Sequence, residues 1–490
     1  MELFSGIDNY QALLIAAGIV VLGYAYTVLS NPLASIPGPW YTLWTEWVWK
    51  YQSITANKPR YIHSLHEKYG TVVRISPKEV SVQDPSATQQ IYHVKNEFLK
   101  STWYKDLIPG PDSVFSTLDI GFHRRHRRLL ASEISESGLM IHKSTIESRV
   151  RLAIQRMAEE MEERGVTDVF RWFLYMTTDI IGELSFGSSF QMLETKEENQ
   201  YFRDLKTIGL AGGIRATFPT LMKINTYIPL PVLKIGPLIR QRIGEYATQS
   251  LERHVKLVEE QGDQAKPTLL SKLYRAADNE ADTLPFEELR QDAMSYIAAG
   301  SDTTANTLTY LIWMVCKHPE VKAKLLEDLK GVPDDFSDQD LKKLPYLDCV
   351  VQETLRLHSA VPAGLPRLVP PGGATFSGHY IPGGYTVSAQ AYSMHRNPAV
   401  YPDPMKYDPE RWRKPTKAMK DAFVPFGGGS RICLGIHLAR MELRLATARF
   451  FTRFPNAKAS TKEGFTDDDM DAEMFFLMSP KNHRCLIDAY

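Results

Sequence analysis

A glycine-rich segment of ten residues, from Phe426 to Gly435, reads F-G-G-G-S-R-I-C-L-G. Three consecutive glycines cannot fill a core and disfavour a helix, so they predict a loop whose backbone passes close to something flat or bulky. Apolar residues recur at helical spacing directly after it, from Ile436 to Leu445. Cys433 is therefore expected near a helix N-terminus, where the helix dipole lowers the pKa of a thiol.

The thiolate of Cys433 suits a metal ligand or a nucleophile. Structural zinc needs several Cys or His at short spacing, and Cys433 has no such neighbours in the sequence. In haem the porphyrin supplies four nitrogens, so one protein thiolate suffices, and that thiolate promotes O–O cleavage. From this segment alone, a buried structural cysteine beside a glycine-rich turn remains the alternative interpretation.

Five positions of the segment match the pattern F-x-x-G-x-R-x-C-x-G: Phe426, Gly429, Arg431, Cys433 and Gly435. The segment thus resembles the haem-binding signature of the cytochrome P-450 monooxygenases. The resemblance implies haem b (iron protoporphyrin IX), with Cys433 as the axial iron ligand and Arg431 on a haem propionate. It also implies that Phe426 and Gly435 contact the cofactor.

The composition fits a large globular protein and excludes some classes of partner. A chain of 490 residues exceeds the usual domain size, so two or three domains, or one large one, are expected. Lys+Arg and Asp+Glu both number 57, so no global charge points to nucleic acid. The four cysteines are far apart, which fits a reducing environment without a disulfide framework.

The amino-terminal region holds one long apolar segment. No charged residue lies between Asn9 and Thr45, and Ala12 to Leu29 is a run of 18 nearly all apolar residues. As a helix this run would be about 27 Å long, close to the hydrocarbon thickness of a bilayer. A signal peptide would begin with basic residues and have a shorter apolar core, whereas this chain begins with Glu2 and Asp8. We therefore predict a membrane anchor.

Residues beyond the anchor set its expected orientation. Lys50, Lys58 and Arg60 follow the span, so the positive-inside rule places this side, with the bulk of the protein, in the cytosol. Four tryptophans also follow it, where an aromatic belt would meet the membrane interface: Trp40, Trp44, Trp47 and Trp49. We expect a single-pass protein of the endoplasmic reticulum membrane whose catalytic domain faces the cytosol.

Three prolines and a glycine between Pro32 and Pro39 predict a stiff, extended connection. The segment resembles the proline-rich hinge that microsomal members of the P-450 family place between anchor and catalytic domain. The expected organisation is a membrane anchor at residues 1–30, a hinge at 31–40 and a haem-thiolate catalytic domain at 41–490.

Short β-rich runs flank a long helical region. Thr71 to Ile75 and Val80 to Val82 predict two paired strands, and strand-like runs return at Ala374 to Phe376 and Tyr385 to Ala389. Between these groups the pattern is mostly helical until about residue 360. A mainly α protein with a small β-rich part, preceded by a single transmembrane helix, is the fold that the P-450 resemblance implies.

A helix is predicted from about Leu284 to Trp313, because a proline and two acidic residues mark its start. In its middle, Ala299 to Thr304 reads A-G-S-D-T-T. Glycine loosens a helix and short polar side chains compete for its backbone, so this composition is unfavourable there. A kinked helix that satisfies its own carbonyls would be the structural explanation.

The same six residues resemble the oxygen-activation motif [AG]-G-x-[DE]-T-[TS] of the P-450 family. The resemblance implies that Ala299 and Gly300 let the helix pass close over the haem. It also implies that Thr303 hydrogen-bonds the bound dioxygen and that Asp302 relays protons from solvent. Asp302 and Thr303 are therefore the expected catalytic residues, and Ala299 is an expected cofactor contact.

His123 to Leu130 reads H-R-R-H-R-R-L-L, which is typical of a solvated basic helix face. The P-450 family places Trp or His four residues before an Arg in this helix, and His123 with Arg127 fits that spacing. By resemblance both reach a haem propionate, a contact that suits a guanidinium group. His126, three residues after His123, is also available for this contact, so the register of the motif on the helix stays open by three residues. The other arginines would give a basic proximal surface.

Glu353 and Arg356 lie on one helix face at i, i+3 spacing, which alone indicates an ordinary surface ion pair. Downstream, Pro409 to Trp412 reads P-E-R-W and resembles a family element whose Arg joins that pair in a buried triad. Glu353, Arg356 and Arg411 are therefore expected to hold the loop that presents Cys433. Their expected role is structural rather than catalytic.

Further segments are expected around a cavity above the haem. By resemblance Ala360 to Leu365 borders the cavity and Arg367 reaches a propionate, although a proline-bounded turn that enters a strand fits these residues too. The apolar, proline-broken stretch from Gly213 to Lys234 is expected to be a loop-rich roof that touches the membrane. The apolar tip from Met474 to Leu477 would line the cavity or pack in the core.

Four motifs in the order of the P-450 family predict a membrane-anchored haem-thiolate monooxygenase. We expect it to insert one oxygen atom from O2 into a small apolar molecule. The sequence lacks a flavin-binding G-x-G-x-x-G unit, so electrons are expected from a separate NADPH-dependent flavoprotein, the cytochrome P-450 reductase, with a small electron-transfer haem protein as a second donor. Gly364 to Gly384 resembles fungal members that tailor polyketides, terpenoids or alkaloids in secondary metabolism.

Three alternative functions follow from other interpretations of the same residues. A haem-thiolate isomerase or dehydratase would not need Thr303. A non-catalytic haem-binding protein would tolerate loss of the oxygen-activation motif. A hydrolase that uses Cys433 as its nucleophile would carry no haem. The intact A-G-S-D-T-T motif favours the monooxygenase.

Overall fold

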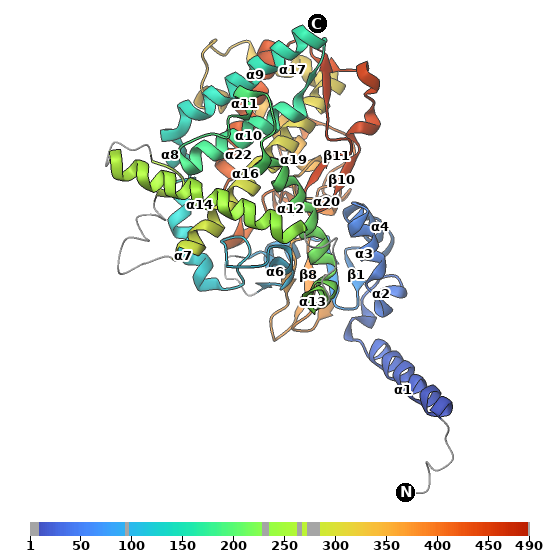
Figure 1. Ribbon diagram of the computed structural model, residues 1–490. Coiled ribbons are helices and arrows are strands. Elements are labelled where there is room, and N and C mark those ends of the chain that lie inside the picture. Colours follow the sequence, from blue (N-terminus) through green and yellow to red (C-terminus); the bar gives the residue numbers. More distant parts are fainter. Residues whose placement is uncertain (1–8, 94–97, 228–234, 262–266, 272–284, 489–490) are drawn as a thin grey trace, which may run out of the picture.

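One helix of 32 residues, α16 (Phe286–Lys317), runs through the middle of the helical part of the protein (Figure 1). The computed structural model describes residues 9–93, 98–227, 235–261, 267–271 and 285–488. At a rise of 1.5 Å per residue α16 is about 48 Å long. Its carboxyl-terminal half is largely apolar and buried, so other helices must surround it. The helix predicted from the sequence is confirmed, and it ends at Lys317 rather than Trp313.

The helices that enclose α16 are themselves buried on the faces that meet it. α10 (Val169–Phe186), which is buried along almost its whole length, lies against α16. α9 (Lys143–Arg164) and α22 (Ile436–Arg453) pack against each other on the same core. α14 (Ile235–Gln261) and α19 (Pro345–Leu357) also contact α16. Removal of these apolar faces from water stabilises the helical part.

The β-rich part contains a mixed sheet whose strands come from distant parts of the chain. Among the described residues its strand order is β1–β2–β8–β5–β3. The strands are β1 (Val72–Ser76), β2 (Glu79–Val82), β3 (Leu99–Lys100), β5 (Arg367–Leu368) and β8 (Thr386–Ser388). β1 and β2 pair with each other, as predicted, and they run antiparallel. Lys100 lies directly opposite Arg367. Strand pairing therefore places two basic side chains together.

Shorter elements complete the fold, and the predicted class of a mainly α protein with small sheets is confirmed. Further helices are α2 (Tyr41–Trp44), α3 (Trp47–Ile54), α4 (Lys58–Tyr69), α5 (Pro85–Ile91), α6 (Trp103–Leu107), α7 (Ile120–Ala131), α8 (Glu136–Leu139), α11 (Met192–Thr195), α17 (Pro319–Leu329), α18 (Asp338–Leu341), α20 (Ala391–Met394) and α21 (Lys417–Ala422). The remaining strands are β4 (Thr167–Asp168), β6 (Ala374–Phe376), β7 (His379–Ile381), β9 (Lys458–Ala459), β10 (Ala472–Met474), β11 (Met478–Pro480) and β12 (Leu486–Asp488).

The apolar stretch from Gly213 to Lys234 is more regular than the sequence suggested. α12 (Gln200–Thr217) extends into it, and α13 (Pro219–Tyr227) follows. Pro219 is compatible with helix because its missing N–H would have no intrahelical partner in the first turn. The prediction of a loop-rich segment is therefore wrong for this part, and residues 228–234 lie outside the described residues.

α1 (Asn9–Leu29) projects away from the rest of the protein (Figure 1). Its side chains are apolar and almost all exposed. Its 21 residues make it long and apolar enough to cross a membrane. Near its end the Tyr24 hydroxyl donates to the Trp44 carbonyl oxygen, and the two rings lie 5.9 Å apart. The apolar helix is thus attached to the α2 region by a specific contact.

A single buried side chain holds the proline-rich segment that follows α1. Arg74 of β1 is 3% exposed, and the shortest hydrogen bonds of its guanidinium group to carbonyl oxygens go to Leu33, Ile36 and Pro39, at 2.9, 2.7 and 3.1 Å. Its Nε also donates to Thr42 Oγ1 at 3.0 Å. The connection is therefore fixed by hydrogen bonds to the β-rich part as well as by its prolines.

Candidate active site

The cysteine loop, residues 426–435, precedes α22 and is closed by a backbone hydrogen bond. The Cys433 N–H donates to the Phe426 carbonyl oxygen at 3.0 Å. Gly429 has a φ of +63°, and a Cβ at this position would lie 1.6 Å from the carbonyl oxygen of Tyr92. A side chain is therefore impossible at Gly429 without moving the backbone. The backbone of Gly429 thus lies close to the backbone of Tyr92, which belongs to the same chain.

The side chain of Cys433 is accessible to solvent, although it lies in a part of the protein that is otherwise largely buried. Its side chain is exposed, whereas the residues next to it in the loop are half-buried. Burial raises the pKa of the thiol, while the Gly435 N–H and the charge of Arg127 lower it. α22 does begin nearby, at Ile436, but the predicted lowering of the thiol pKa is wrong because lost hydration outweighs the helix terminus. A metal ion would reverse this balance, since metal coordination deprotonates a thiol.

The middle of α16 presents an exposed patch inside a buried region. Ala298 and Ala299 are exposed although their neighbours on the helix are half-buried or buried. Burial, followed by the charges of Asp292 and Cys433, raises the pKa of Tyr296 on the same helix. Tyr296 is therefore close to Cys433. The patch on α16 and the thiol of Cys433 thus lie near the same interior space.

The residues of the A-G-S-D-T-T motif serve different purposes on α16. The Thr303 hydroxyl donates to the Ala299 carbonyl oxygen at 2.7 Å, so its oxygen is left to accept a hydrogen bond from a ligand. Asp302 is half-buried beside it. At Gly300 the space for a side chain is filled by Ile181 of α10, which lies 2.7 Å from the Cβ position. Gly300 is therefore required by helix packing, whatever lies beside Ala299.

Cationic side chains converge beside the cysteine loop. The Nη1 atom of Arg431 is buried and has no hydrogen-bond partner among the described residues. Burial and the charge of Arg367 lower the pKa of Arg431 to about 10. Lys100 and Arg367 are 6% and 4% exposed, and they are direct neighbours across β3 and β5. Buried like charges are unfavourable at this spacing unless an anion lies among them.

α7 adds two further residues to this cation cluster. Burial, followed by the charge of Arg431, lowers the pKa of His123 to about 3. Arg127 Nη1 donates to the carbonyl oxygen of Ile432 at 2.7 Å, directly before the cysteine. His123 and Arg127 therefore both lie at the cysteine loop. His126 does not, because its ring contacts two carboxylates of α16.

This arrangement fits a flat, metal-centred ring with two carboxylates, which describes haem. Cys433 would ligate the metal, the exposed alanines of α16 would lie against the ring, and the cations would bind the propionates. The unpartnered Arg431 Nη1 is the observation that tests this fit, because buried donors in proteins almost always have acceptors. Phe426 and Gly435 belong to the same loop, and the Cβ position of Gly435 is 3.9 Å from Cys433 Sγ.

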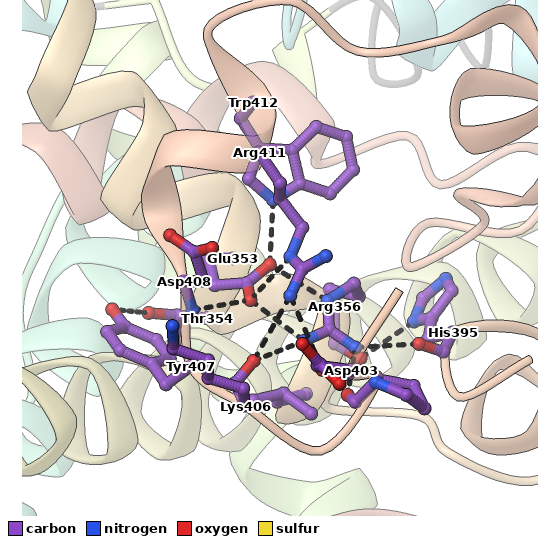
Figure 2. A network of polar contacts seen from close by, with 12 residues as sticks. Glu353, Thr354, Arg356, His395, Asp403, Lys406, Tyr407, Asp408, Arg411 and Trp412 are labelled. Atoms are coloured by element: carbon purple, nitrogen blue, oxygen red, sulfur yellow. Dashed lines mark hydrogen bonds and ion pairs between the residues drawn. The ribbon is translucent and has the colours of Figure 1, made fainter. Parts of the chain in front are cut away.

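A buried ionic network lies at the carboxyl end of α19 (Figure 2). Glu353 and Arg356 have 0% exposed side chains, and two hydrogen bonds of 2.8 Å join them. Arg411 Nε donates to Glu353 Oε1 at 3.0 Å, and Trp412 Nε1 donates to Glu353 Oε2 at 2.8 Å. The structure thus brings together the three residues that the motifs grouped, and it adds the indole of Trp412.

The network continues toward the cysteine loop through His395. Arg356 Nη1 donates to the His395 carbonyl oxygen at 2.8 Å (Figure 2). Burial and the charge of Arg356 lower the pKa of His395 to about 3, so its neutral ring accepts the Val424 N–H at Nε2, at 3.0 Å. Val424 lies two residues before Phe426. Sequence analysis missed His395, because a single histidine in a loop forms no motif.

A family model described as Cytochrome P450 matches residues 36–486. The chain belongs to the cytochrome P450 family. It is 47% identical over 483 residues to cytochrome P450 monooxygenase tazI of Aspergillus terreus, covering 98% of this chain and 99% of that protein. It is 40% identical over 466 residues to cytochrome P450 monooxygenase orf2 of Aspergillus niger, covering 95% and 94%. It is 34% identical over 475 residues to cytochrome P450 monooxygenase aflV of Aspergillus parasiticus, covering 94% and 92%.

The predicted fold and the predicted enzyme class are therefore confirmed: this P450 is an oxidoreductase of the oxygen-incorporating type. The family also implies a haem cofactor, which the donor set around Cys433 fits.

Two buried charged residues of this P450 escaped the sequence analysis. Lys100 donates to the Phe115 carbonyl oxygen, and burial followed by the charge of Arg367 lowers its pKa. Glu442 of α22 is 1% exposed and forms a hydrogen bond with Thr304 of the oxygen-activation motif. A single lysine in a strand of two residues forms no sequence motif. Only the pairing of β3 with β5, and of α22 with α16, shows what these residues contact.

Aromatic rings from two distant segments of the P450 meet beside the cation cluster. Trp103 and Phe115 both lie near Phe476, with ring centroids 5.8 and 6.1 Å away. The Met478 N–H donates to the Ala360 carbonyl oxygen at 2.9 Å. Of the two segments that were expected to border a cavity, 360–365 is thus bonded to the residue that directly follows 474–477.

Replacement of Glu353 by Gln tests the buried network. The change leaves two buried guanidinium groups without their carboxylate, so we expect the free energy of unfolding to fall by about 3–5 kcal/mol. Urea unfolding followed by tryptophan fluorescence measures this. The control is Glu410→Gln, which removes an exposed carboxylate that pairs with Lys324 and Arg413 and should change stability by less than about 1 kcal/mol. Equal effects of the two changes would contradict the assignment.

Replacement of Glu442 by Gln tests the buried carboxyl group under α16. Burial raises the pKa of Glu442 from 4.5 to about 8. Between these values the folded protein holds a proton that the unfolded chain has lost, so stability falls as the pH rises from about 4.5 to 8. We therefore expect the Glu442→Gln protein to gain stability relative to the wild type between pH 5 and pH 8, measured by urea midpoints.

The exposed Glu162 provides the matched control for this experiment, because Glu162→Gln makes the same chemical change at the surface. Its urea midpoints should follow those of the wild type at both pH values. Parallel curves for Glu442→Gln and the wild type would show that the buried carboxyl group does not hold a proton.

Proposed function

We propose that this P450 is a membrane-anchored haem-thiolate monooxygenase that inserts one oxygen atom from O2 into a small apolar molecule. The observation that carries the proposal is the unpartnered Arg431 Nη1, buried among other cations beside a cysteine that faces open space. When bound there, haem supplies the oxygen chemistry, because a thiolate-ligated iron binds dioxygen and promotes its cleavage. The protein positions the cofactor and the substrate, excludes water and delivers protons.

The propionates of the haem are assigned to the cation cluster. Arg431, Arg367, Lys100 and His123 approach the same region, because, besides burial, the charge of Arg367 lowers the pKa of Arg431 and of Lys100, and the charges of Arg431 and Lys100 lower the pKa of His123. Against the larger effect of burial, the charge of Arg127 lowers the pKa of Cys433, and Arg127 Nη1 donates to the carbonyl oxygen of the preceding residue, Ile432. Neutralisation of two propionates by these groups would hold the ring in one orientation. Phe426 and Gly435 would contact it from the cysteine loop.

Proton delivery is assigned to Thr303 and Asp302, with Ala299 against the ring. The Thr303 hydroxyl hydrogen is used on the Ala299 carbonyl group, so the hydroxyl oxygen can accept a proton-bearing partner at the reacting site. Asp302 lies next to it and would bring protons from solvent. Glu353, Arg356 and Arg411 take no part in this chemistry, and we assign them the task of holding the cysteine loop.

Membrane attachment is proposed for α1 together with an apolar surface near it. Residues 1–30 would form the anchor, 31–40 the connection and 41–490 the catalytic domain. Trp40 and Trp47 are exposed, as is Ile224 of α13, and the Trp47 ring lies 5.9 Å from Phe218. The apolar surfaces of α3 and of the α12–α13 region are therefore continuous, which suits contact with lipid. The endoplasmic reticulum is the proposed membrane, with the catalytic domain in the cytosol.

Electrons are proposed to come from an NADPH-dependent flavoprotein, the cytochrome P450 reductase, with a small haem protein as a second donor. Arg124 and Arg128 of α7 are exposed on the helix that also contacts the cysteine loop. His437, at the start of α22, is exposed too. Basic groups near the thiolate side of the haem would attract an acidic partner and orient it.

The proposed substrate is a fungal secondary metabolite, of the polyketide, terpenoid or alkaloid type. Support comes from the resemblance of Gly364 to Gly384 to such enzymes and from the Aspergillus monooxygenases to which the chain is similar. The aromatic group formed by Trp103, Phe115 and Phe476 favours a flat, apolar molecule, because aromatic faces stack well on one another.

Cys433→Ser tests the iron ligand. We expect the purified wild-type protein to carry haem and, once reduced, to show the red-shifted Soret band with carbon monoxide that a thiolate ligand produces. The serine variant should lack that band. Cys349→Ser is the control, because Cys349 is a buried thiol of α19 and its replacement should leave the band in place. Wild-type protein without haem would refute the proposed function.

Thr303→Ala tests the delivery of protons. The assay contains the reductase and a compound that shifts the haem to high spin. We expect the variant to consume NADPH while its yield of product per NADPH falls by up to roughly a hundredfold, the factor that a positioned proton carrier contributes. Peroxide should replace product. Thr307→Ala is the control, because Thr307 makes the same bond one turn later, to the Thr303 carbonyl group at 2.9 Å. An unchanged product yield in Thr303→Ala would exclude the role.

A further inference from the structure

A buried histidine joins α7 to α16 through two carboxylates. His126 and Asp292 both have 0% exposed side chains, and His126 Nδ1 lies 2.5 Å from Asp292 Oδ2. On its other side His126 Nε2 lies 3.0 Å from Glu288 Oε2. The ring of Phe122 stacks on the imidazole, with centroids 3.8 Å apart. Each ring nitrogen thus faces a carboxylate oxygen, and a ring with a proton on both nitrogens can donate to both.

The cluster holds a third segment as well. The second oxygen of Asp292, Oδ1, accepts the Val114 N–H at 2.7 Å. The loop before α7 is thereby attached to α16 at the same point as α7 itself. Asp292 is satisfied on both oxygens, one by His126 and one by the backbone, which is the condition for burying a carboxylate.

The positions of these residues along their helices connect the cluster with the proposed haem site. On α7, His126 lies between His123 and Arg127, which are one turn apart and reach the cysteine loop. On α16, Asp292 lies seven residues before Ala299 and eleven before Thr303. Seven residues are almost two turns, so these side chains share one helix face. A slide of α7 along α16 would therefore change the distance between the cation cluster and the oxygen-activation motif.

We propose that His126 is a positioning residue that fixes α7 to α16, and thereby holds His123 and Arg127 at a set distance from Ala299 and Thr303. The inference rests on the proposed haem site and assigns to it a residue that touches no cofactor. A buried carboxylate that is hydrogen-bonded on both oxygens, as Asp292 is, has a narrow range of favourable geometries, so it defines a register more strictly than apolar contacts do. The P450 family spacing concerned His123 and Arg127 and considered His126 only as an alternative residue for the propionate contact.

Two conservative substitutions break the cluster at different points. His126→Gln can donate to one carboxylate but not to both. Asp292→Asn keeps the shape of the side chain and an oxygen for the Val114 N–H, and it removes the charge that faces His126. Arg125→Gln is the matched control, because Arg125 is a partly exposed residue of α7 that binds the same Glu288, at 3.1 Å. Its loss removes a neighbouring contact without touching the buried pair.

The experiment measures the transfer of haem from the full-length holoprotein to apomyoglobin, together with the midpoint potential of the iron. Loss of an outer partner of a metal site commonly weakens the site by roughly ten- to a hundredfold. We therefore expect haem transfer to become faster by that factor in His126→Gln and in Asp292→Asn, and the potential to shift. The double variant should be no worse than either single one, because both break the same contact. Arg125→Gln should behave as the wild type.

Folded variants with wild-type haem transfer and wild-type potential would overturn the inference, even if their thermal stability were lower, since that result describes an ordinary structural ion pair. An additive double variant would overturn it too. A wild-type protein without the red-shifted carbon monoxide band would refute the proposed haem site together with this inference. A normal wild-type band with unchanged variants would refute the inference alone.

Discussion

The carboxylate of Glu353 is fully buried and is balanced by two guanidinium groups, those of Arg356 and Arg411. Its bonds to Arg411 and Trp412, and the bond from Arg356 to the His395 carbonyl oxygen, tie together segments that are distant in sequence: α19, the chain near His395 and the P-E-R-W turn. Through His395 and the Val424 N–H the same network reaches the cysteine loop. Because a buried charge is tolerated only when it is paired and hydrogen-bonded, the path of the chain here is closely specified. The loop that carries Cys433 starts from this fixed point.

The cation cluster beside the cysteine loop contrasts with that network. Around Glu353 the charges balance within the protein, whereas Lys100 and Arg367 lie opposite each other and Arg431 Nη1 has no partner among the described residues. The first group balances its own charges, whereas the second consists of cations. This contrast supports the proposal that the first group serves the fold and that the second binds the propionates of haem.

In two places of this P450 a single buried polar side chain holds separate elements together. Arg74 holds the segment after α1 through several carbonyl groups at once, and His126 joins α7 to α16 through two carboxylates. Both are buried, and both act between elements rather than within one. Such contacts determine relative placement, which apolar packing alone leaves adjustable by small shifts. Packing also decides at Gly300, where Ile181 takes the space of a side chain.

The sequence by itself identified the family and the fold class, and it predicted the cysteine and the motif residues as the site, because each is carried by local patterns: glycines before Cys433, a helical period with misplaced polar residues, and E-x-x-R followed by P-E-R-W. It placed Arg367 and Arg431 only by resemblance, and it missed Lys100, His395 and Glu442, which belong to no pattern. It also gave the wrong direction for the pKa of Cys433 and the wrong structure for the start of the 213–234 stretch. Burial decides these points, and burial depends on which distant segments meet. The partners of His126 were likewise decided by tertiary structure alone, since only the packing of α7 on α16 brings two carboxylates to its ring.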